Sequence, residues 1–400
     1  MAITDYTESE RKAELLALLL ALKENGSYHS TGSDGKILYT LLFTTYKKMI
    51  TQDRQNFFIP QQQQSAIATS LQNTIDFYDA TKQGKIKQLL ENLKPDDRTS
   101  FMILPIQFLT EGEQKHAAGL LIHRSNDQYV LSILDKARFF QQRTGSYLTI
   151  PEKNIEKLSE LLLDSKKSDE IYQNSPTISY DRWSNYGILK AFTTLSNEPQ
   201  AKDLKIKLSR QIEGNCIIAG VDAAFKTALY HCHTDIFQTI DTRKEKLTPK
   251  YNVKENATFQ MRRYFLNTLK GNDHNENKKL DRIFSYYEER KKMKKKLLKL
   301  NKKWKNSRNP LLKLIYHLKK NSIQKKQYTI HHGFNNMMKR DFSIVPLNSL
   351  PKERVQNLIK KDYQKTSIAE LYAKVSPSKL TYIQKTKKKR FSFSLTSTEK

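Results

Sequence analysis

The first hundred residues place apolar side chains at the three- and four-residue spacing of buried helices. This spacing predicts four helices, over about residues 8–24, 37–50, 61–80 and 85–93. Pro95 follows the last of them and cannot continue it. We therefore expect a helical N-terminal region over residues 1–98.

Beyond this region, continuous apolar runs replace the helical spacing. The run Phe101–Leu109 indicates a buried strand, and Pro105 inside it indicates a strand end or a bulge. Two further apolar runs flank the polar turn Ser125–Asp127, a pattern that predicts a β-hairpin. His116 opens the first strand of this hairpin and Asp135 closes the second, so antiparallel pairing would bring them to the same end.

A mixed stretch separates this hairpin from a second apolar segment. Residues 153–164 predict an amphipathic helix, residues 165–205 are mixed and polar, and Lys205–Leu208 fits a short strand. From Cys216 to Tyr230, small and apolar residues dominate. They predict a buried helix that begins at the cysteine.

Beyond residue 250 the sequence becomes polar and rich in lysine. Leu280–Trp304 predicts a long basic helix with an apolar stripe, Pro310 interrupts it, and Leu311–Leu318 begins another helix. The Ser-, Thr- and Lys-rich stretch Ser376–Lys400 predicts a disordered tail.

Charge divides the chain into two unlike parts. Residues 251–400 carry 38 Lys and Arg against 11 Asp and Glu, a net charge of +27, whereas the first 250 residues carry 32 against 30. At 38% hydrophobic residues, the chain has enough apolar side chains to bury a core. The basic half predicts an acidic partner.

The chain has only two cysteines, Cys216 and Cys232, too few for a disulfide framework, which favours a reducing compartment. The apolar run Leu15–Leu22 is followed at once by Lys23 and Glu24, so we expect no signal peptide. No run reaches the roughly 18–20 apolar residues that span a bilayer. These features predict a soluble protein without a transmembrane segment.

Cys216, His116 and Asp135 are suited to nucleophilic catalysis. Cysteine attacks as a thiolate, and the positive end of a helix dipole would stabilise a thiolate at position 216. A histidine within hydrogen-bond range completes an ion pair and later protonates a leaving amine, while a carboxylate fixes the imidazole tautomer. Gln211, five residues before the cysteine, would donate its amide to an oxyanion together with the Cys216 N–H.

Each of these residues also has a purely structural interpretation. A lone cysteine at a helix start is commonly part of the core, His116 alone fits a surface histidine at a strand end, and Asp135 alone fits a strand terminator. His123 is a reserve base, although it lies too close to Asp135 in sequence to pair well across the hairpin. His231–His233 has no second ligand pair at zinc spacing, so we expect no metal and no cofactor.

Four segments occur in one order along the chain. They are Phe101–Gln107 (FMILPIQ), His116–Ile122 (HAAGLLI), Tyr129–Asp135 (YVLSILD) and Gln211–Cys216 (QIEGNC). This order resembles that of the ubiquitin-like-protein proteases and adenains, the clan CE cysteine proteases. The resemblance covers residues 99–232, about a third of the chain.

The resemblance implies an α+β fold with a papain-like clan CE core, in which a central helix carries the cysteine beside a small mixed sheet. It implies that Cys216 attacks, His116 is the base, Asp135 orients that base and Gln211 supplies the oxyanion hole. The implied substrates are proteins joined to ubiquitin or a ubiquitin-like modifier. The expected domains are residues 1–98, helical; 99–245, the catalytic core; 246–375, a basic helical extension; and 376–400, a disordered basic tail.

Three features depart from the family pattern. Many members place Trp after the histidine and Gly after the cysteine, where this chain has Ala117 and Ile217, and the segment between Asp135 and Cys216 is long, which implies an insertion. The same scaffold resembles the YopJ-type acetyltransferases of bacterial pathogens. Those enzymes use the His–acid–Cys set to take an acetyl group from acetyl-CoA, so acetyl transfer is an alternative function.

The basic half leaves its partner open. Lys291–Lys305 fits a solvated helix packed on the core, a helix lying on an anionic membrane, or a backbone-level contact to nucleic acid. Lys385–Arg390 resembles a nuclear localisation patch. The chain resembles a bacterial effector delivered into a host cell, acting in the cytoplasm, at a membrane surface or in the nucleus. A non-catalytic binding protein acting through the basic half is a further alternative.

Overall fold

A computed structural model of the chain describes residues 3–23, 31–109, 115–137, 145–168, 184–198, 200–204, 206–209, 211, 214–237, 245–246 and 257–344. The predicted tail at 376–400 and the basic patch at 385–390 lie outside the described residues.

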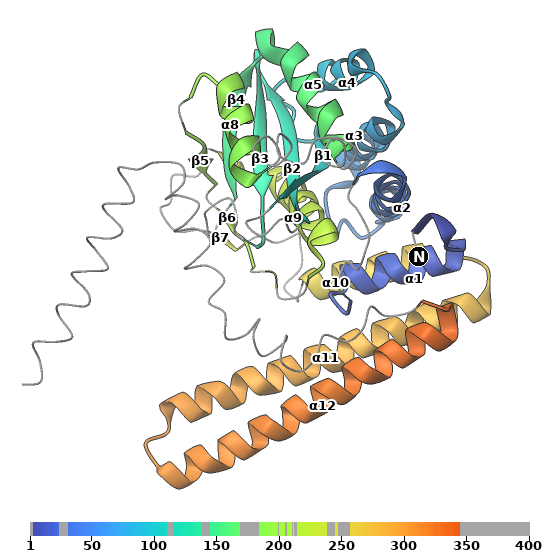
Figure 1. Ribbon diagram of the computed structural model, residues 1–400, viewed down its shortest axis with the longest axis vertical. Coiled ribbons are helices and arrows are strands. Elements are labelled where there is room, and N and C mark those ends of the chain that lie inside the picture. Colours follow the sequence, from blue (N-terminus) through green and yellow to red (C-terminus); the bar gives the residue numbers. More distant parts are fainter. Residues whose placement is uncertain are drawn as a thin grey trace, which may run out of the picture.

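Helices and a small sheet share the chain, so the fold class is α+β (Figure 1). The helices are α1 (Glu8–Leu19), α2 (Gly32–Thr51), α3 (Gln61–Asp79), α4 (Gln83–Glu91), α5 (Ile155–Lys166), α8 (Asn185–Leu195), α9 (Cys216–His231), α10 (Ala257–Leu269), α11 (His274–Asn306) and α12 (Pro310–Phe342). The strands are β1 (Met102–Leu109), β2 (Lys115–Ser125), β3 (Gln128–Leu134), β4 (Ser146–Pro151), β5 (Lys202–Asp203), β6 (Ile206–Lys207) and β7 (Glu245–Lys246). Short 3-10 helices η1 (Ile3–Asp5) and η2 (Glu152–Asn154) precede α1 and α5.

The main sheet is a five-stranded antiparallel meander of order β1-β2-β3-β4-β5, and β6 pairs with β7 in parallel. β1 is buried along its whole length, and β2 and β3 are nearly so, because helices pack against them. Helix α9 contacts β1, β2 and β3, α3 contacts β1, and α8 contacts β4 and β1. This burial explains why β1–β3 appear in the sequence as continuous apolar runs.

The N-terminal helices form where the apolar spacing predicts them, with shifted ends. α1 ends at Leu19 rather than near residue 24, because the chain turns at Ala21, whose φ is 53°. α2 begins at Gly32, before the first residue of its apolar pattern. Their long apolar side chains form much of the protein's core.

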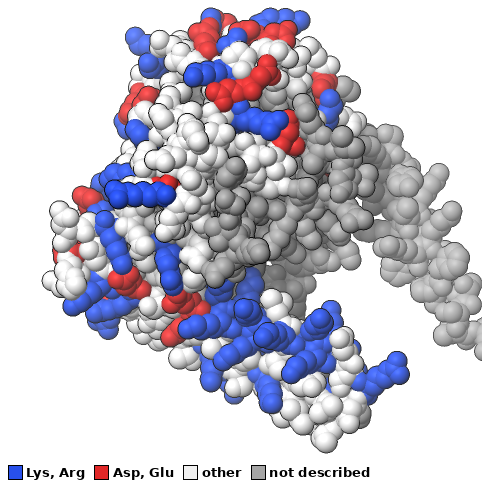
Figure 2. Space-filling view, turned by 180° about the vertical axis from the view of Figure 1, so that it is seen from behind, with Lys and Arg blue, Asp and Glu red and all other residues white. Residues whose placement is uncertain are grey.

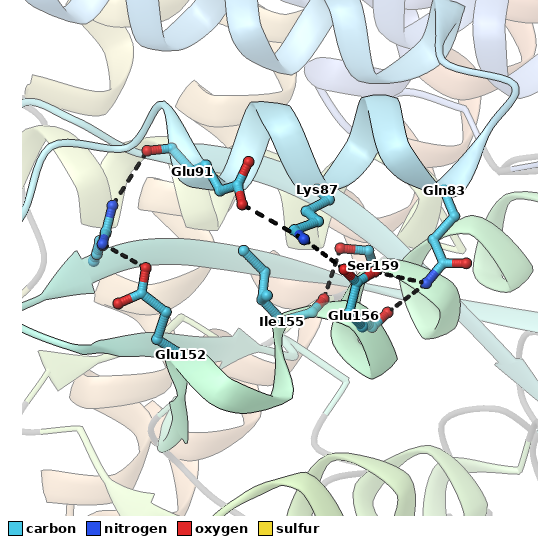
Figure 3. Close-up of polar contacts among 8 residues, drawn as sticks. Gln83, Lys87, Glu91, Glu152, Ile155, Glu156 and Ser159 are labelled. Atoms are coloured by element: carbon cyan, nitrogen blue, oxygen red, sulfur yellow. Dashed lines mark hydrogen bonds and ion pairs between the residues drawn. The ribbon is translucent and has the colours of Figure 1, made fainter.

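Surface ion pairs join α4 to α5 beside the sheet (Figure 3). Lys87 forms an ion pair with Glu156, and Gln83 donates a hydrogen bond to the Glu156 backbone oxygen at 2.9 Å. Arg124 of β2 pairs with Glu152 of η2 at 2.6 Å. Such surface pairs add little to stability, because solvent screens their charges.

The predicted β-hairpin is present as β2 and β3, with a two-residue turn in which Asn126 has a φ of 48°. The expectation that Pro105 marks a strand end or a bulge is wrong. Pro105 lies within an unbroken β1 and pairs with Gly119. Because β1 is at the edge of the sheet, a residue without an N–H is tolerated there.

Several elements, among them β4, α8 and α10, lie where the sequence indicated none. In β4, the buried positions alternate with half-buried ones, and only Leu148 and Ile150 give an apolar signal among the buried ones. Helix α8 falls inside the stretch read as mixed and polar, and α10 inside the basic half, where Met261 and Phe265 form its buried face.

The predicted basic helices form a long antiparallel hairpin of α11 and α12 below the rest of the molecule (Figure 1). Arg282 pairs with Asp341 at 2.8 Å near one end. Lys313 lies 5.7 Å from the ring centre of Trp304 near the other end. No helix within the described residues combines the length and apolarity that crossing a bilayer requires.

Candidate active site

Helix α9 packs directly on strand β2 through two glycines. A Cβ atom on Gly220 would lie 2.5 Å from the backbone nitrogen of Gly119, and one on Gly119 would lie 2.2 Å from the Gly220 oxygen. The two backbones are therefore in contact, and any larger residue at either position would push them apart. This contact sets which residues of α9 lie beside which residues of β2.

His116 is the second residue of β2 and pairs with Phe108 of β1. It is 7% exposed, and its ring lies edge-on to the Phe108 ring with centroids 4.9 Å apart. A buried imidazole is tolerated only where its nitrogens find polar partners.

Asp135 directly follows β3 and supplies one of these partners. In the hairpin register Gly119 faces Leu134, so Asp135 is a diagonal neighbour of His116 on the same face. His116 Nε2 lies 3.0 Å from Asp135 Oδ1, and that oxygen also accepts a hydrogen bond from the Ala137 N–H at 2.9 Å. The carboxylate is thus held in place and in turn holds the ring.

Cys216 begins α9, where the amide groups of the first turn carry partial positive charge. The side chain of the preceding Asn215 does not cap the helix, because its Nδ2 donates to the Leu18 oxygen at 2.7 Å. Tyr39 donates its hydroxyl to the Ile217 oxygen at 2.7 Å. These contacts fix the first turn and with it the cysteine.

The Cys216 side chain hydrogen-bonds to the ring of His116. Burial alone would lower the pKa of His116, but the charge of Cys216, then the charge and hydrogen bond of Asp135, raise it to about 10. The direction of this shift favours the protonated ring, between Asp135 and Cys216. A cysteine in such a pair is set up to act as a thiolate nucleophile.

Gln211 also lies in this region. Its backbone N–H donates to the Lys136 oxygen at 3.0 Å, one residue after Asp135. Ile212 and Glu213, which join it to the helix, lie outside the described residues. The structure thus brings His116, Asp135 and Cys216 into contact and tethers the Gln211 backbone beside them.

The reserve base His123 lies at the opposite end of β2. It pairs with Val130, is 4% exposed and packs against His231 with ring centroids 4.8 Å apart. From His116 to His123 the strand advances seven residues, and from Cys216 to His231 the helix advances fifteen, so each spans about 23 Å. The strand and the helix therefore run parallel, with His116 beside Cys216 at one end and His123 beside His231 at the other. His123 is therefore far from Asp135.

A buried ion cluster fixes the middle of α9 to α2 and α10. Asp222 accepts hydrogen bonds from both Arg262 terminal nitrogens at 2.6 Å, from Lys226 at 2.8 Å and from Tyr46 at 2.9 Å. Burial would raise the pKa of Asp222, but Arg262 and Lys226 hold it well below its usual range. Burial lowers the pKa of Lys226 to about 7.

Access to the sulfur is narrow. Cys216 is 6% exposed and Asp135 is 5% exposed. Within the described residues, no three His, Cys, Asp or Glu side chains gather as they would around a metal ion.

No protein-family model, no curated protein and no solved structure matches this chain.

Several residues that shape the site were not identified from sequence. The small residues of HAAG (His116–Gly119) and CIIAG (Cys216–Gly220) were a signal of close helix–strand packing. Asp222 and Arg262, 40 residues apart, gave no local sign of their pairing.

Proposed function

We propose that this chain is a cysteine isopeptidase with a clan CE core, which removes ubiquitin or a ubiquitin-like modifier from proteins. The observation that supports it most is the buried His116, hydrogen-bonded to Asp135 and to Cys216 at the first residue of α9. The order of these residues along the chain is the one on which the sequence resemblance rests, whereas the main sheet is antiparallel and not mixed as the resemblance implies.

In the proposed reaction, the Cys216 thiolate attacks the carbonyl carbon of the modifier's C-terminal glycine. The carbonyl π electrons move to its oxygen, and the Gln211 amide and the Cys216 N–H stabilise the resulting oxyanion. The intermediate collapses, the C–N bond breaks, and His116 gives its proton to the departing lysine amine. A thioester between the modifier and Cys216 remains.

Water then completes the cycle. His116, now neutral, takes a proton from the attacking water, and the thioester breaks to release the modifier's carboxylate and the Cys216 thiolate. Asp135 accepts from His116 Nε2 throughout and stabilises the imidazolium each time it forms.

The test is covalent labelling with a panel of ubiquitin and ubiquitin-like C-terminal electrophilic probes. The wild-type chain should form an adduct at Cys216 that Cys216→Ala abolishes, a loss of at least about a thousandfold. Cys232→Ser is the matched control, because burial raises the pKa of Cys232 to about 12 and leaves that thiol inert. An absence of adduct with every probe would refute the proposal.

The same triad could instead accept an acetyl group. Incubation with acetyl-CoA would then leave an acetyl adduct on Cys216, and the modifier probes would leave none. If Cys216→Ala leaves every activity intact while neutralising Lys291–Lys305 abolishes it, the chain is a binding protein.

We further propose that the protein acts inside a host cell as a bacterial effector. This proposal rests on the sequence resemblance.

A further inference from the structure

Most of the α11–α12 hairpin carries a dense positive charge. From Arg290 to Arg340 the chain has 18 Lys and Arg and no Asp or Glu. Figure 2 shows lysines and arginines gathered along the projecting part of this hairpin. The acidic residues of the two helices, Glu276, Asp281, Glu288, Glu289 and Asp341, lie at the other end. The charge is thus concentrated on one projecting element.

The end of the hairpin near the turn between the two helices exposes large apolar side chains. Leu311, Leu314 and Leu318 of α12 are 64, 54 and 58% exposed, and Trp304 of α11 is 44% exposed. In the described part of the chain, the large apolar side chains that are exposed all lie between Leu298 and Tyr328. A hydrophobic surface of this kind marks an interaction site.

The apolar side chains occupy a wide face rather than a narrow seam. Leu311, Leu314, Ile315 and Leu318 follow the i, i+3, i+4, i+7 spacing, and Leu312 widens the face to about 160° at 100° per residue. A wide apolar face bordered by lysines is typical of helices that lie in the interface of a lipid layer with anionic headgroups.

The hairpin meets the rest of the protein at the end away from this turn. Lys12 of α1 pairs with Glu276 at 3.4 Å, and Phe259 of α10 packs against Phe284 with ring centroids 5.6 Å apart. The end that carries Trp304 and Leu311 projects away from the sheet (Figure 1). It is therefore free to approach a large flat surface without moving the candidate active site.

Charge decides which partner covers this face. A second copy would bring another 18 cations against the first, and the chain's own residues 345–400 add 13 Lys and Arg against 4 acidic residues. Nucleic acid would neutralise the lysines but leave Leu311, Leu314 and Leu318 in water. Anionic lipid satisfies both requirements, because lysines contact headgroups while leucines enter the acyl boundary.

We propose that the α11–α12 tip is a membrane-docking device that inserts its leucines and Trp304 into the interface of an anionic lipid bilayer. Lysine stems lie along the apolar face and their ammonium groups reach the headgroups. Trp304 occupies the interfacial depth that tryptophan prefers. The site binds the bilayer surface and does not cross it, and the active-site region remains on the aqueous side.

The test uses the full chain with vesicles of phosphatidylcholine, with and without phosphatidylserine. The chain has two tryptophans, so Trp183→Phe leaves Trp304 as the only one. Vesicles with phosphatidylserine should sediment the protein and shift Trp304 emission to the blue, and high salt should weaken both effects. Cys216→Ala should bind equally, which separates this proposal from the catalytic one.

Leu314→Gln with Leu318→Gln should weaken vesicle binding about tenfold or more, because two apolar side chains no longer enter the interface. Asn321→Gln with Ser322→Gln, both exposed on the same helix, should leave binding unchanged. All four positions are exposed, so the unfolding transition should not move.

Other results would overturn the proposal. Equal binding to pure phosphatidylcholine would remove the role of the lysines. Unchanged binding of the Leu314→Gln/Leu318→Gln chain, or nucleic acid binding with no Trp304 shift on vesicles, would leave charge alone as the cause. Self-association that the leucine variant abolishes would assign the face to a second copy.

Discussion

At each end of α9 a cysteine and a histidine of strand β2 lie close to the helix terminus. The pKa values of the groups at these two ends are shifted in different directions. At its N-terminal end, Cys216 hydrogen-bonds to His116, whose pKa is raised to about 10. At its C-terminal end, burial raises the pKa of Cys232 to about 12 and lowers that of His231 to about 4. Burial is nearly equal at the two ends, so burial does not set the difference.

The two ends differ in the charged and hydrogen-bonding groups that contact each histidine. Asp135 contacts His116 at 3.0 Å, whereas among the described residues neither ring nitrogen of His123 has a hydrogen-bond partner. The N-terminal end also lies in the positive field of the helix dipole, which favours an anion at Cys216. His231 also has an aspartate nearby, but its Nδ1 lies 3.8 Å from Asp235 Oδ1, beyond hydrogen-bond distance. A carboxylate in hydrogen-bond contact with the ring therefore distinguishes the candidate catalytic pair from the pair at the other end.

The largest expected effect comes from breaking the N-terminal pair. His116→Gln should lower kcat/KM for a fluorogenic ubiquitin C-terminal amide by about 10²–10⁴, because the base and acid are lost. Asp135→Asn should cost less, since the ring and the sulfur remain. His231→Gln at the other end should leave the rate unchanged, and a loss equal to that of His116→Gln would contradict the comparison.

The next effect concerns the anchor that holds both ends in place. Asp222→Asn leaves Arg262 and Lys226 buried without their anion, so the free energy of unfolding should fall by about 3–5 kcal/mol. Urea denaturation measures the loss. Lys226→Met keeps the Asp222–Arg262 pair and should cost less, and an equal cost would show that the pair does not anchor α9.

The smallest effect is a pH dependence from the C-terminal end. Burial holds the pKa of His123 well below 6.5, so the unfolded chain binds a proton that the folded chain does not. The stability is fully present above pH 6.5 and is lost as the pH falls, by about 1.4 kcal/mol per pH unit for one histidine. His123→Leu should flatten the slope between pH 6.5 and 4, and an unchanged slope would reject this assignment.

Much of the fold could be predicted from local patterns. The apolar spacing located α1–α4, the runs around Asn126 located the β2–β3 hairpin, and the small-residue run from Cys216 located α9. These elements are buried on broad faces, so they contain enough apolar residues for their spacing to be recognised in the sequence. β4 and α8 bury few apolar side chains and were not found.

The candidate site was predictable in part. Antiparallel pairing brings His116 near Asp135, a consequence of local hairpin register. The contact of Cys216 with His116 depends on Gly119 meeting Gly220, which joins segments a hundred residues apart. No local sequence pattern predicts a contact between such distant segments. In this chain, the contact of Cys216 with His116 was suggested by the order of the four segments that carry the family resemblance.

The most direct measurement is an NMR titration of the histidine side chains, with His116 assigned through His116→Gln. The account predicts an imidazolium at position 116 that persists to about pH 10, and a lower pKa in Cys216→Ser because the sulfur's charge is gone. A His116 ring that is already neutral at pH 7, as His123 and His231 should be, would contradict it.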